Sequence, residues 1–273
     1  MTKILNGSEL AGYIKQRQAH QVRGLRQAHG IEPKLAIIVT ADNPVIYLYV
    51  RLKKAYGAEI LVEVDVHKVK QTEVKDLLNK LSNDEGIYGI IVQLPLSDPN
   101  QTEEIVNLVP PNKDVDALGQ NAIFEPATPM AIMWLLAGYN VDLNGKSILL
   151  IGRGKLVGAP LEKILTETGH DVTVADRSTP DLQGLALQAD IIITAAGSPA
   201  ILYSNMIKAG AVVVDAGVAS EDGKTVGDVA PEVHDRDDLT ITPVKGGVGP
   251  LTVCALFENV IRAAQKAAEI KKL

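Results

Sequence analysis

The chain has 273 residues, 46% of them hydrophobic, and can therefore bury a sizeable core in one large domain or two smaller ones. A formal net charge of −6 and the lack of a dense Lys/Arg run argue against nucleic-acid binding. No apolar run approaches the roughly 18 residues of a membrane span, and the first residues do not resemble a secretion signal. The single cysteine, Cys254, favours a reducing cytoplasm, and the scattered histidines predict no metal site.

The first part of the chain alternates between strand and helix patterns. Apolar runs predict buried strands over 34–40, 60–67 and 89–96, and helical patterns predict helices over 45–54, 72–81 and 103–109. This alternation is typical of a parallel sheet. A loop-like stretch follows over 110–120, and its opening Pro-Pro-Asn marks a boundary.

A second alternating series begins after a predicted helix over 129–139. Its strands are expected over 147–152, 171–176, 190–197, 211–217 and 239–244, with one helix over 157–168 and a last one over 251–270. We therefore predict an α/β protein with two domains and parallel sheets. Residues 1–120 and a C-terminal helix over 251–273 form the first domain, and residues 121–250 form the second, which is Rossmann-like.

Tyr49 and Lys53 are four residues apart and share one face of the predicted helix. Val45, Ile46, Leu48 and Leu52 are apolar, so part of this helix packs against a core. The spacing alone leaves two interpretations of Lys53: a solvated lysine, which is the commoner case, or a group that points into a site.

A glycine-rich turn follows the first strand of the second series. In "LLIGRGKLVGAPLEKIL", Gly152, Gly154 and Gly158 stand where a strand gives way to a helix. Glycines at such a turn let backbone N–H groups approach a pyrophosphate at the helix N-terminus, so the turn predicts nucleotide binding. The alternative is a tightly packed turn without a ligand.

The residues around the next strand end give opposing indications about the nucleotide. Asp176 could accept hydrogen bonds from a ribose diol and would repel a 2′-phosphate, which favours NAD. Arg177 and Arg153 would attract that phosphate, which favours NADP. The sequence leaves the choice open.

A second glycine-rich segment, "TPVKGGVGPLTV", precedes the last helix. Gly246, Gly247 and Gly249 would let a flat ligand or a phosphate approach the backbone, and Pro250 suits the first turn of a helix. A strand-to-helix connection that needs positive φ angles explains the same glycines equally well.

These segments together resemble the methylenetetrahydrofolate dehydrogenase/methenyltetrahydrofolate cyclohydrolase family. The resemblance runs in order through "DNPVIYLYVRLKK", "GIIVQLPL", "NKDVDALG", "PATP", "GRGKLVGAP", "GDVA" and "TPVKGGVGPLT". It implies that methylenetetrahydrofolate gives a hydride to NADP, or to NAD, and that water opens the methenyl product to 10-formyltetrahydrofolate, a one-carbon donor in purine biosynthesis. It also implies a folate site in a cleft between the domains and a homodimer formed through the second domain.

The resemblance assigns roles to individual residues. Lys53 matches the catalytic lysine, Gln93 the glutamine that orients it, Tyr49 the tyrosine on the folate's aromatic portion and Asp116 the acid that pairs with the pterin. The implied substrate-binding set adds Gly246, Gly247, Gly249 and Pro250. The implied cofactor-binding set is Gly152, Arg153, Gly154, Gly158, Asp176, Arg177 and Val218.

Three departures limit the resemblance. Gly154 stands where the family usually has a serine that helps hold the 2′-phosphate, which puts the NADP preference in doubt. Lys245 replaces a proline and Ala127 replaces a cysteine, and neither change removes the proposed chemistry. The alternatives are a monofunctional dehydrogenase, a dehydrogenase resembling shikimate dehydrogenase, and a non-catalytic nucleotide- or folate-binding module.

Overall fold

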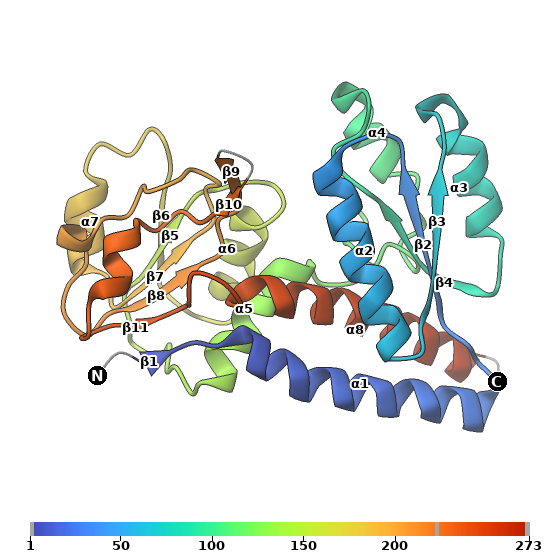
Figure 1. Cartoon of the computed structure of the whole chain (residues 1–273), viewed down its shortest axis with the longest axis horizontal. Coiled ribbons are helices and arrows are strands. Elements are labelled where there is room, and N and C mark those ends of the chain that lie inside the picture. Colours follow the sequence, from blue (N-terminus) through green and yellow to red (C-terminus); the bar gives the residue numbers. More distant parts are fainter. Residues whose placement is uncertain (1–2, 222–223, 271–273) are drawn as a thin grey trace. The chain divides into compact units, whose positions relative to one another are not determined.

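The computed structural model describes residues 3–221 and 224–270 (Figure 1). The chain forms two compact units. The first unit contains residues 12–127 and 253–273, and the second contains residues 1–11 and 128–252. Two long helices, α1 (Gly7–His29) and α8 (Val248–Ile270), begin in the second unit and continue into the first.

The first unit is built on a parallel three-stranded sheet in the order β3 (Glu63–Lys68), β2 (Lys34–Val39), β4 (Ile87–Val92). Every residue of β4 is buried, as is expected of a strand with both faces covered. The connecting helices are α2 (Pro44–Glu59), α3 (Val74–Ser82) and α4 (Thr102–Val106), with 3-10 turns η1 (Gln71–Glu73) and η2 (Pro99–Gln101).

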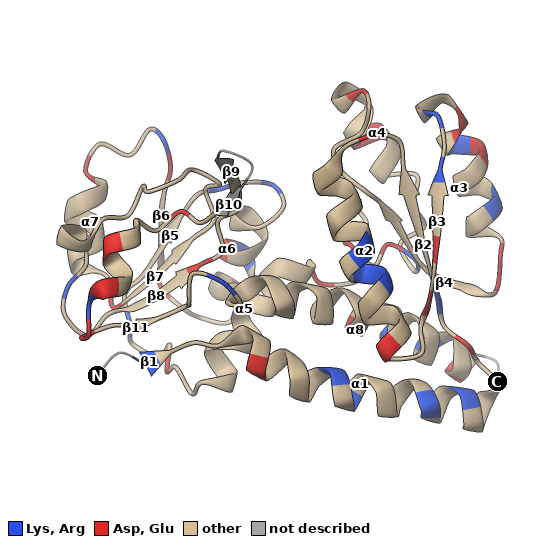
Figure 2. Ribbon diagram, viewed as in Figure 1, with Lys and Arg blue, Asp and Glu red and all other residues tan. Residues whose placement is uncertain are grey.

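Helix α2 starts at a well-defined cap. Asn43 accepts a hydrogen bond from the Val45 backbone N–H at 2.8 Å, and Pro44 occupies the first helical position. The helix packs against β3. Its inner side carries Ile46, Val50 and Gly57, and Figure 2 shows basic residues on its middle turns. The cap and the buried side together fix the direction in which Tyr49 and Lys53 project.

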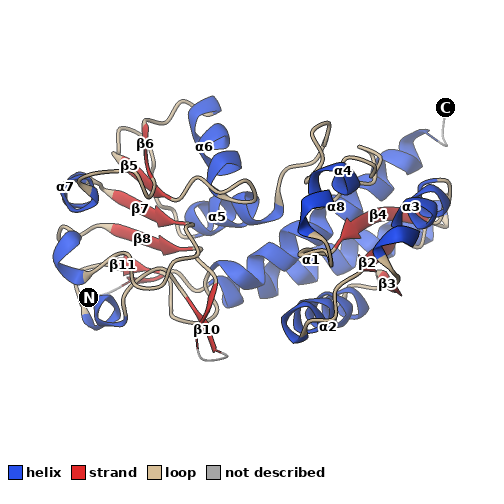
Figure 3. Ribbon diagram, turned by 90° about the horizontal axis from the view of Figure 1, so that it is seen from above, coloured by secondary structure: helices blue, strands red, loops and turns tan. Residues whose placement is uncertain are grey.

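The second unit contains a six-stranded sheet whose pairings are all parallel. Figure 3 shows most of its strands lying in one layer from β6 to β11. The strand order is β1 (Lys3–Ile4), β11 (Thr240–Ile241), β8 (Val212–Asp215), β7 (Ile191–Thr194), β5 (Ile148–Ile151), β6 (Val172–Ala175). The order reverses between β5 and β7, and in open α/β sheets ligands bind at the carboxyl ends of strands at such a point.

The other elements of the second unit are helices, short turns and a hairpin. They are α5 (Ala127–Gly138), α6 (Gly158–Glu167), α7 (Leu182–Gln188), η3 (Ser204–Met206), η4 (Pro231–Asp235) and the antiparallel pair β9 (Ala219–Glu221) and β10 (Lys224–Val226). Aliphatic residues from β5, β7, β8 and α7 share one core cluster, which makes the sheet a rigid support for the loops at its ends.

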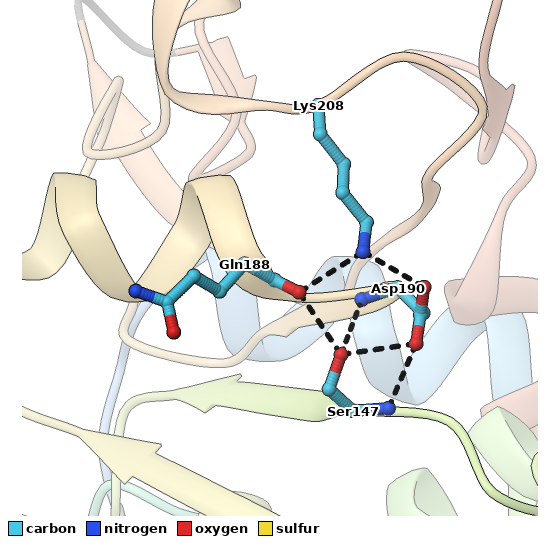
Figure 4. A network of polar contacts seen from close by, with 4 residues as sticks. All are labelled: Ser147, Gln188, Asp190 and Lys208. Carbon is cyan, nitrogen blue, oxygen red and sulfur yellow. Dashed lines mark hydrogen bonds and ion pairs between the residues drawn. The ribbon is translucent and has the colours of Figure 1, made fainter.

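A polar network closes the amino edge of this sheet (Figure 4). Lys208 Nζ donates to Asp190 Oδ1 at 2.8 Å, and Ser147 Oγ donates to Asp190 Oδ2 at 3.0 Å. Both Ser147 and Lys208 also donate to the Gln188 carbonyl. The network links the segments that lead into β5, β7 and β8.

The predicted fold class and most predicted elements are confirmed, with three differences. Residues 1–11 join the second unit, because β1 pairs with β11 and the Ser8 N–H donates to Gly246 O at 2.9 Å. The two compact units divide at 128 and 253, and the domain bounds expected at 121 and 251 stay a prediction. Helices α1 and α7 and the β9–β10 hairpin were not predicted. Within the described residues, no helix is long and apolar enough to cross a membrane.

Candidate active site

Lys53 and Gln93 meet at the carboxyl edge of the first unit's sheet. Lys53 lies on α2, and Gln93 is the residue directly after β4. Lys53 Nζ donates a hydrogen bond to Gln93 Oε1 at 2.8 Å, and Gln93 Nε2 donates to the Leu94 carbonyl at 3.1 Å. Both side chains are half-buried. Because its amide nitrogen is already engaged, Gln93 presents its oxygen to the lysine and fixes the direction of the amine.

The surroundings of Lys53 make it easier to deprotonate. Burial lowers the pKa of the Lys53 ammonium, because the charged form loses contact with water, and the Asp116 carboxylate partly opposes this effect. Gln93 accepts a hydrogen bond without adding a negative charge that would raise the pKa further. A lysine in such a position can accept and return a proton at a pH where an exposed lysine stays charged.

Asp116 lies on a loop that two buried polar residues hold in place. The Asp114 carboxylate is 3% exposed and accepts hydrogen bonds from the Gly119 N–H at 2.8 Å and the Leu118 N–H at 3.4 Å. Asn259, from α8, donates to the Val115 carbonyl at 2.9 Å. Burial raises the pKa of Asp114, which the loop N–H groups oppose. Sequence analysis missed both supporting residues, although Asp114 stands two positions before Asp116.

Tyr49 lies one turn before Lys53 on α2 and is 37% exposed. Val45, Leu48 and Leu52 are also exposed, so an apolar stripe at helical spacing continues along this side of α2. The stripe leaves the Tyr49 ring accessible to a flat apolar group. A contact between Tyr49 and a folate stays a prediction.

Two of the three glycines in the turn after β5 are sterically required. Gly152 has a φ of +103°, which favours glycine, and a Cβ added to Gly158 would lie 2.0 Å from the Gly152 carbonyl oxygen. At Gly154, no atom lies within 4 Å of where a Cβ would stand. The turn therefore brings α6 close to the end of β5 through Gly158, and it leaves open space at Gly154, where a ligand can approach the backbone.

The loop after β7 is held beside this turn by Asp228. The Asp228 carboxylate accepts hydrogen bonds from the backbone N–H groups of Ala196 at 2.7 Å, Gly197 at 3.3 Å and Ser198 at 2.7 Å. Gly152 faces the same loop, since a Cβ there would lie 2.6 Å from the Ala195 carbonyl oxygen. Sequence analysis noted "GDVA" only as part of the resemblance and did not assign this supporting role to Asp228.

The remaining predicted cofactor residues lie at neighbouring strand ends. Asp176 and Arg177 directly follow β6, the neighbour of β5, and both are exposed. Arg153 follows Gly152 and forms an ion pair with Glu162 on α6. Val218 is 58% exposed, and its carbonyl oxygen would be 3.5 Å from a Cβ at Gly197. The structure thus brings the predicted cofactor residues to one edge of the second unit's sheet.

The second glycine segment packs against the start of α1. Gly246 has a φ of +84°, and a Cβ at Gly7 would lie 1.8 Å from the Gly247 carbonyl oxygen. Gly249 has open space, and Pro250 lies in the first turn of α8. Positive φ and close packing therefore account for Gly246 and Gly247, and a substrate-binding role for this segment stays a prediction. These residues belong to the second unit, whereas Lys53 belongs to the first.

Comparison with known proteins decides the family. The catalytic-domain model of tetrahydrofolate dehydrogenase/cyclohydrolase matches residues 5–116, and the model of its NAD(P)-binding domain matches residues 126–268. The chain belongs to the tetrahydrofolate dehydrogenase/cyclohydrolase family. A bifunctional protein FolD of Acetivibrio thermocellus is 36% identical, with 98% of this chain and 99% of that protein covered.

Solved structures of family members agree with the fold. Bifunctional FolD from Campylobacter jejuni is 36% identical with a TM-score of 0.91, covering 98% of this chain and 100% of that chain. The FolD dehydrogenase-cyclohydrolase of Trypanosoma brucei, solved with NADP and an inhibitor, is 29% identical with a TM-score of 0.91, covering 97% and 98% of the two chains. Family membership replaces the shikimate-dehydrogenase-like alternative.

Proposed function

We propose that this protein oxidises 5,10-methylenetetrahydrofolate to 5,10-methenyltetrahydrofolate with a nicotinamide cofactor and hydrolyses that product to 10-formyltetrahydrofolate. The observation that carries the proposal is the 2.8 Å hydrogen bond from Lys53 Nζ to Gln93 Oε1, together with the lowered pKa of that lysine. A merely solvated lysine would have neither a fixed partner nor a destabilised charge.

In the hydration step, Lys53 moves protons. The neutral amine accepts a proton from the water molecule as its oxygen bonds to the methenyl carbon. It then gives that proton to the ring nitrogen as the carbon–nitrogen bond breaks, while the hydroxyl group loses its own proton to solvent and becomes the formyl carbonyl. Gln93 holds the amine in one orientation throughout. Asp116 pairs with the pterin's N–H donors, and Tyr49 packs on the folate's aromatic portion, so both residues place the reacting carbon beside Lys53.

The hydride step needs no strongly basic side chain, because the folate nitrogen supplies the electrons that expel the hydride. When bound, the oxidised nicotinamide accepts that hydride. The open space at Gly154 and the start of α6 at Gly158 fit a nucleotide pyrophosphate. Asp228 keeps the loop after β7 in a fixed position beside the turn. We propose NADP as the cofactor, in line with the NADP complex of the T. brucei relative, with NAD as the alternative.

The test uses purified protein with methylenetetrahydrofolate and either NAD or NADP. Reduced nicotinamide and methenyltetrahydrofolate are followed separately, and the disappearance of the methenyl compound is compared with its spontaneous rate. Formation and accelerated loss together support both activities. Formation without accelerated loss supports the monofunctional dehydrogenase, and tight folate binding without turnover supports the non-catalytic module. A homodimer formed through the second domain stays a prediction, which the mass of the protein in solution will test.

A further inference from the structure

The Arg153 guanidinium forms an ion pair with the Glu162 carboxylate inside the predicted nucleotide site. Its Nε donates to Glu162 Oε2 at 2.8 Å, and its Nη2 donates to Glu162 Oε1 at 3.1 Å. The Glu162 side chain is 25% exposed and anchored on α6, whereas the Arg153 side chain is 60% exposed. This two-pronged pairing occupies the Nε–Nη2 edge of the guanidinium, one of the two edges that can bind two oxygens of a phosphate group, and it places a negative charge directly against Arg153.

The pair lies where a nucleotide's adenosine ribose is expected. Strands β5 and β6 are parallel neighbours with Ile151 opposite Ala175, and the Gly152 N–H donates to the Ala175 carbonyl at 2.8 Å. Arg153 and Asp176 therefore leave adjacent strand ends. In Rossmann-like domains the acid after the second strand bonds the ribose 2′-hydroxyl, and a nearby arginine accommodates a 2′-phosphate.

A second carboxylate, that of Asp176, lies at the same corner, which is the place where β5 and β6 end. Asp176 Oδ1 accepts hydrogen bonds from the Ser178 hydroxyl at 2.6 Å and the Ser178 N–H at 2.8 Å. These hydrogen bonds lower the pKa of Asp176, with a smaller contribution from the charge of Arg153. Arg177, next in the chain, forms no ion pair with any residue that the structure describes.

The Arg153 guanidinium thus lies near two carboxylates, those of Glu162 and Asp176, which offset its positive charge. A 2′-phosphate that uses the Nε–Nη2 edge of Arg153 must displace Glu162, and one that uses the other edge of Arg153 lies near the charge of the Glu162 carboxylate; both cost binding free energy. A free 2′-hydroxyl meets neither obstacle, because it can donate to Asp176. Compared with the same site without Glu162, the arrangement therefore weakens NADP binding and leaves NAD binding unaffected, so it narrows the proposed preference for NADP.

We propose that Glu162 is a specificity-determining residue: its carboxylate competes with the 2′-phosphate of NADP for Arg153 and so shifts the cofactor preference toward NAD. This proposal rests on the nucleotide-binding role proposed for the second unit. A purely structural Arg153–Glu162 pair, which fastens the glycine turn to α6, would affect both cofactors equally.

The experiment compares Glu162→Gln with the wild-type protein. Glutamine keeps the length of the side chain and one hydrogen-bond acceptor for Arg153 but removes the charge. The probes are 2′,5′-ADP, which carries the 2′-phosphate, and 5′-AMP, which lacks it, with both dissociation constants measured by titration calorimetry. We expect Glu162→Gln to tighten 2′,5′-ADP binding about three- to tenfold and to leave 5′-AMP binding within about twofold.

A matched control is available on the same helix. Glu167 pairs with Lys163 at 3.7 Å on an exposed part of α6, so Glu167→Gln removes the same charge without touching Arg153. It should change neither affinity by more than about twofold. In an Arg153→Gln background, Glu162→Gln should no longer favour 2′,5′-ADP, because the contested guanidinium is absent.

The outcomes separate the two proposals. If both probes bind and Glu162→Gln leaves their affinity ratio unchanged, the role of Glu162 is refuted while nucleotide binding stands. If Glu167→Gln changes the ratio as much as Glu162→Gln does, general charge on α6 is responsible and the specific competition is refuted. If the wild-type protein binds neither probe, the nucleotide-binding role fails and the Glu162 proposal fails with it.

Discussion

Replacing Gln93 by glutamate should separate the two proposed half-reactions. The substitution keeps an acceptor oxygen at the position that now lies 2.8 Å from Lys53 Nζ, but it adds a negative charge. At that distance and an effective dielectric constant of about 20, the attraction is about 6 kcal/mol, which corresponds to about four pKa units. Solvent near this half-buried pair and desolvation of the new carboxylate reduce the effect, so we expect the pKa of Lys53 to rise by about two units, roughly half of that upper limit.

The consequence for the rate follows from the neutral amine. At a pH below the pKa of Lys53 in the wild-type protein, each unit of increase lowers the neutral fraction tenfold, so Gln93→Glu should slow hydration of methenyltetrahydrofolate about a hundredfold in that pH range. The rising limb of the pH–rate profile should move to higher pH by the same number of units. Formation of the methenyl compound should change far less, because hydride departure needs no strong base.

The assay follows the disappearance of methenyltetrahydrofolate above its spontaneous rate across a pH series. Gln93→Met provides the control, because it removes the acceptor without introducing a charge. It should lower the rate through lost orientation of Lys53 but should not shift the profile to higher pH. A Gln93→Glu profile that coincides with that of the wild-type protein would refute the role of Lys53 as the group whose neutral form limits hydration.

Three further substitutions test other parts of the molecule. Lys53→Met should abolish accelerated hydration, and retained hydration would contradict the proposed proton transfer. Asp228→Asn removes a buried charge that costs stability, but it keeps only one of the two acceptor oxygens and places an amide N–H₂ against backbone N–H groups. The lost hydrogen bonds should lower the free energy of unfolding by about 2–3 kcal/mol and weaken 5′-AMP binding. Unchanged values in denaturation and calorimetry would argue against the supporting role of Asp228. Asp190→Asn should lower the melting temperature most near pH 7. Hydrogen bonds from Lys208 and Ser147 lower the pKa of Asp190 in the folded state. The carboxylate therefore contributes its full stabilisation above the unfolded-state pKa of about 4, and this stabilisation is lost as the pH falls toward the folded-state pKa. An equal change in melting temperature at pH 7 and pH 3 would contradict this origin.

The repeating pattern of the chain was sufficient to predict the fold class and most strands. Strand β4 is an uninterrupted apolar run, and Gln93, the first polar residue after it, lies at the strand's carboxyl end, as predicted. Helix α1 was missed because many of its residues are polar or charged, and because the small Ala11 and the polar Gln18 occupy places on its buried side between Ile14, Val22 and Leu25. The grouping of residues 1–11 with the second unit was equally hidden, since it depends on the pairing of two-residue strands far apart in the sequence.

The candidate site was predicted in its central residues but not in its supports. Lys53 and Gln93 are 40 positions apart, so only the family resemblance connects them in the sequence, whereas in the structure a 2.8 Å hydrogen bond joins them. The pairing of Arg153 with Glu162 has no sequence signature, because Glu162, like Glu167 on the same helix, could have faced solvent instead. Local patterns report which residues lie at a strand end, whereas the partner of a long side chain depends on packing.

The carboxylates of the second unit distinguish the two edges of its sheet. At the amino edge, Asp190 is partly exposed and its pKa is lowered by Lys208 and Ser147, so its charge stabilises the fold at neutral pH. At the carboxyl edge, Asp228 is fully buried and its pKa is raised, chiefly by desolvation and in part by the nearby Asp215 charge. For such a group, protonation as the pH falls favours the folded state, so its ionised form costs stability at neutral pH.

Asp114 repeats this pattern in the first unit. It too is buried with a raised pKa, and it too accepts backbone N–H groups of a loop that carries a proposed site residue, Asp116. A buried carboxylate that costs stability is retained where it fixes a loop, because a charged acceptor gathers several N–H groups at one point. A buried carboxylate with a raised pKa therefore supports each of the two loops, Asp114 the proposed folate loop and Asp228 the proposed nucleotide loop. Such pKa shifts are expected near functional sites.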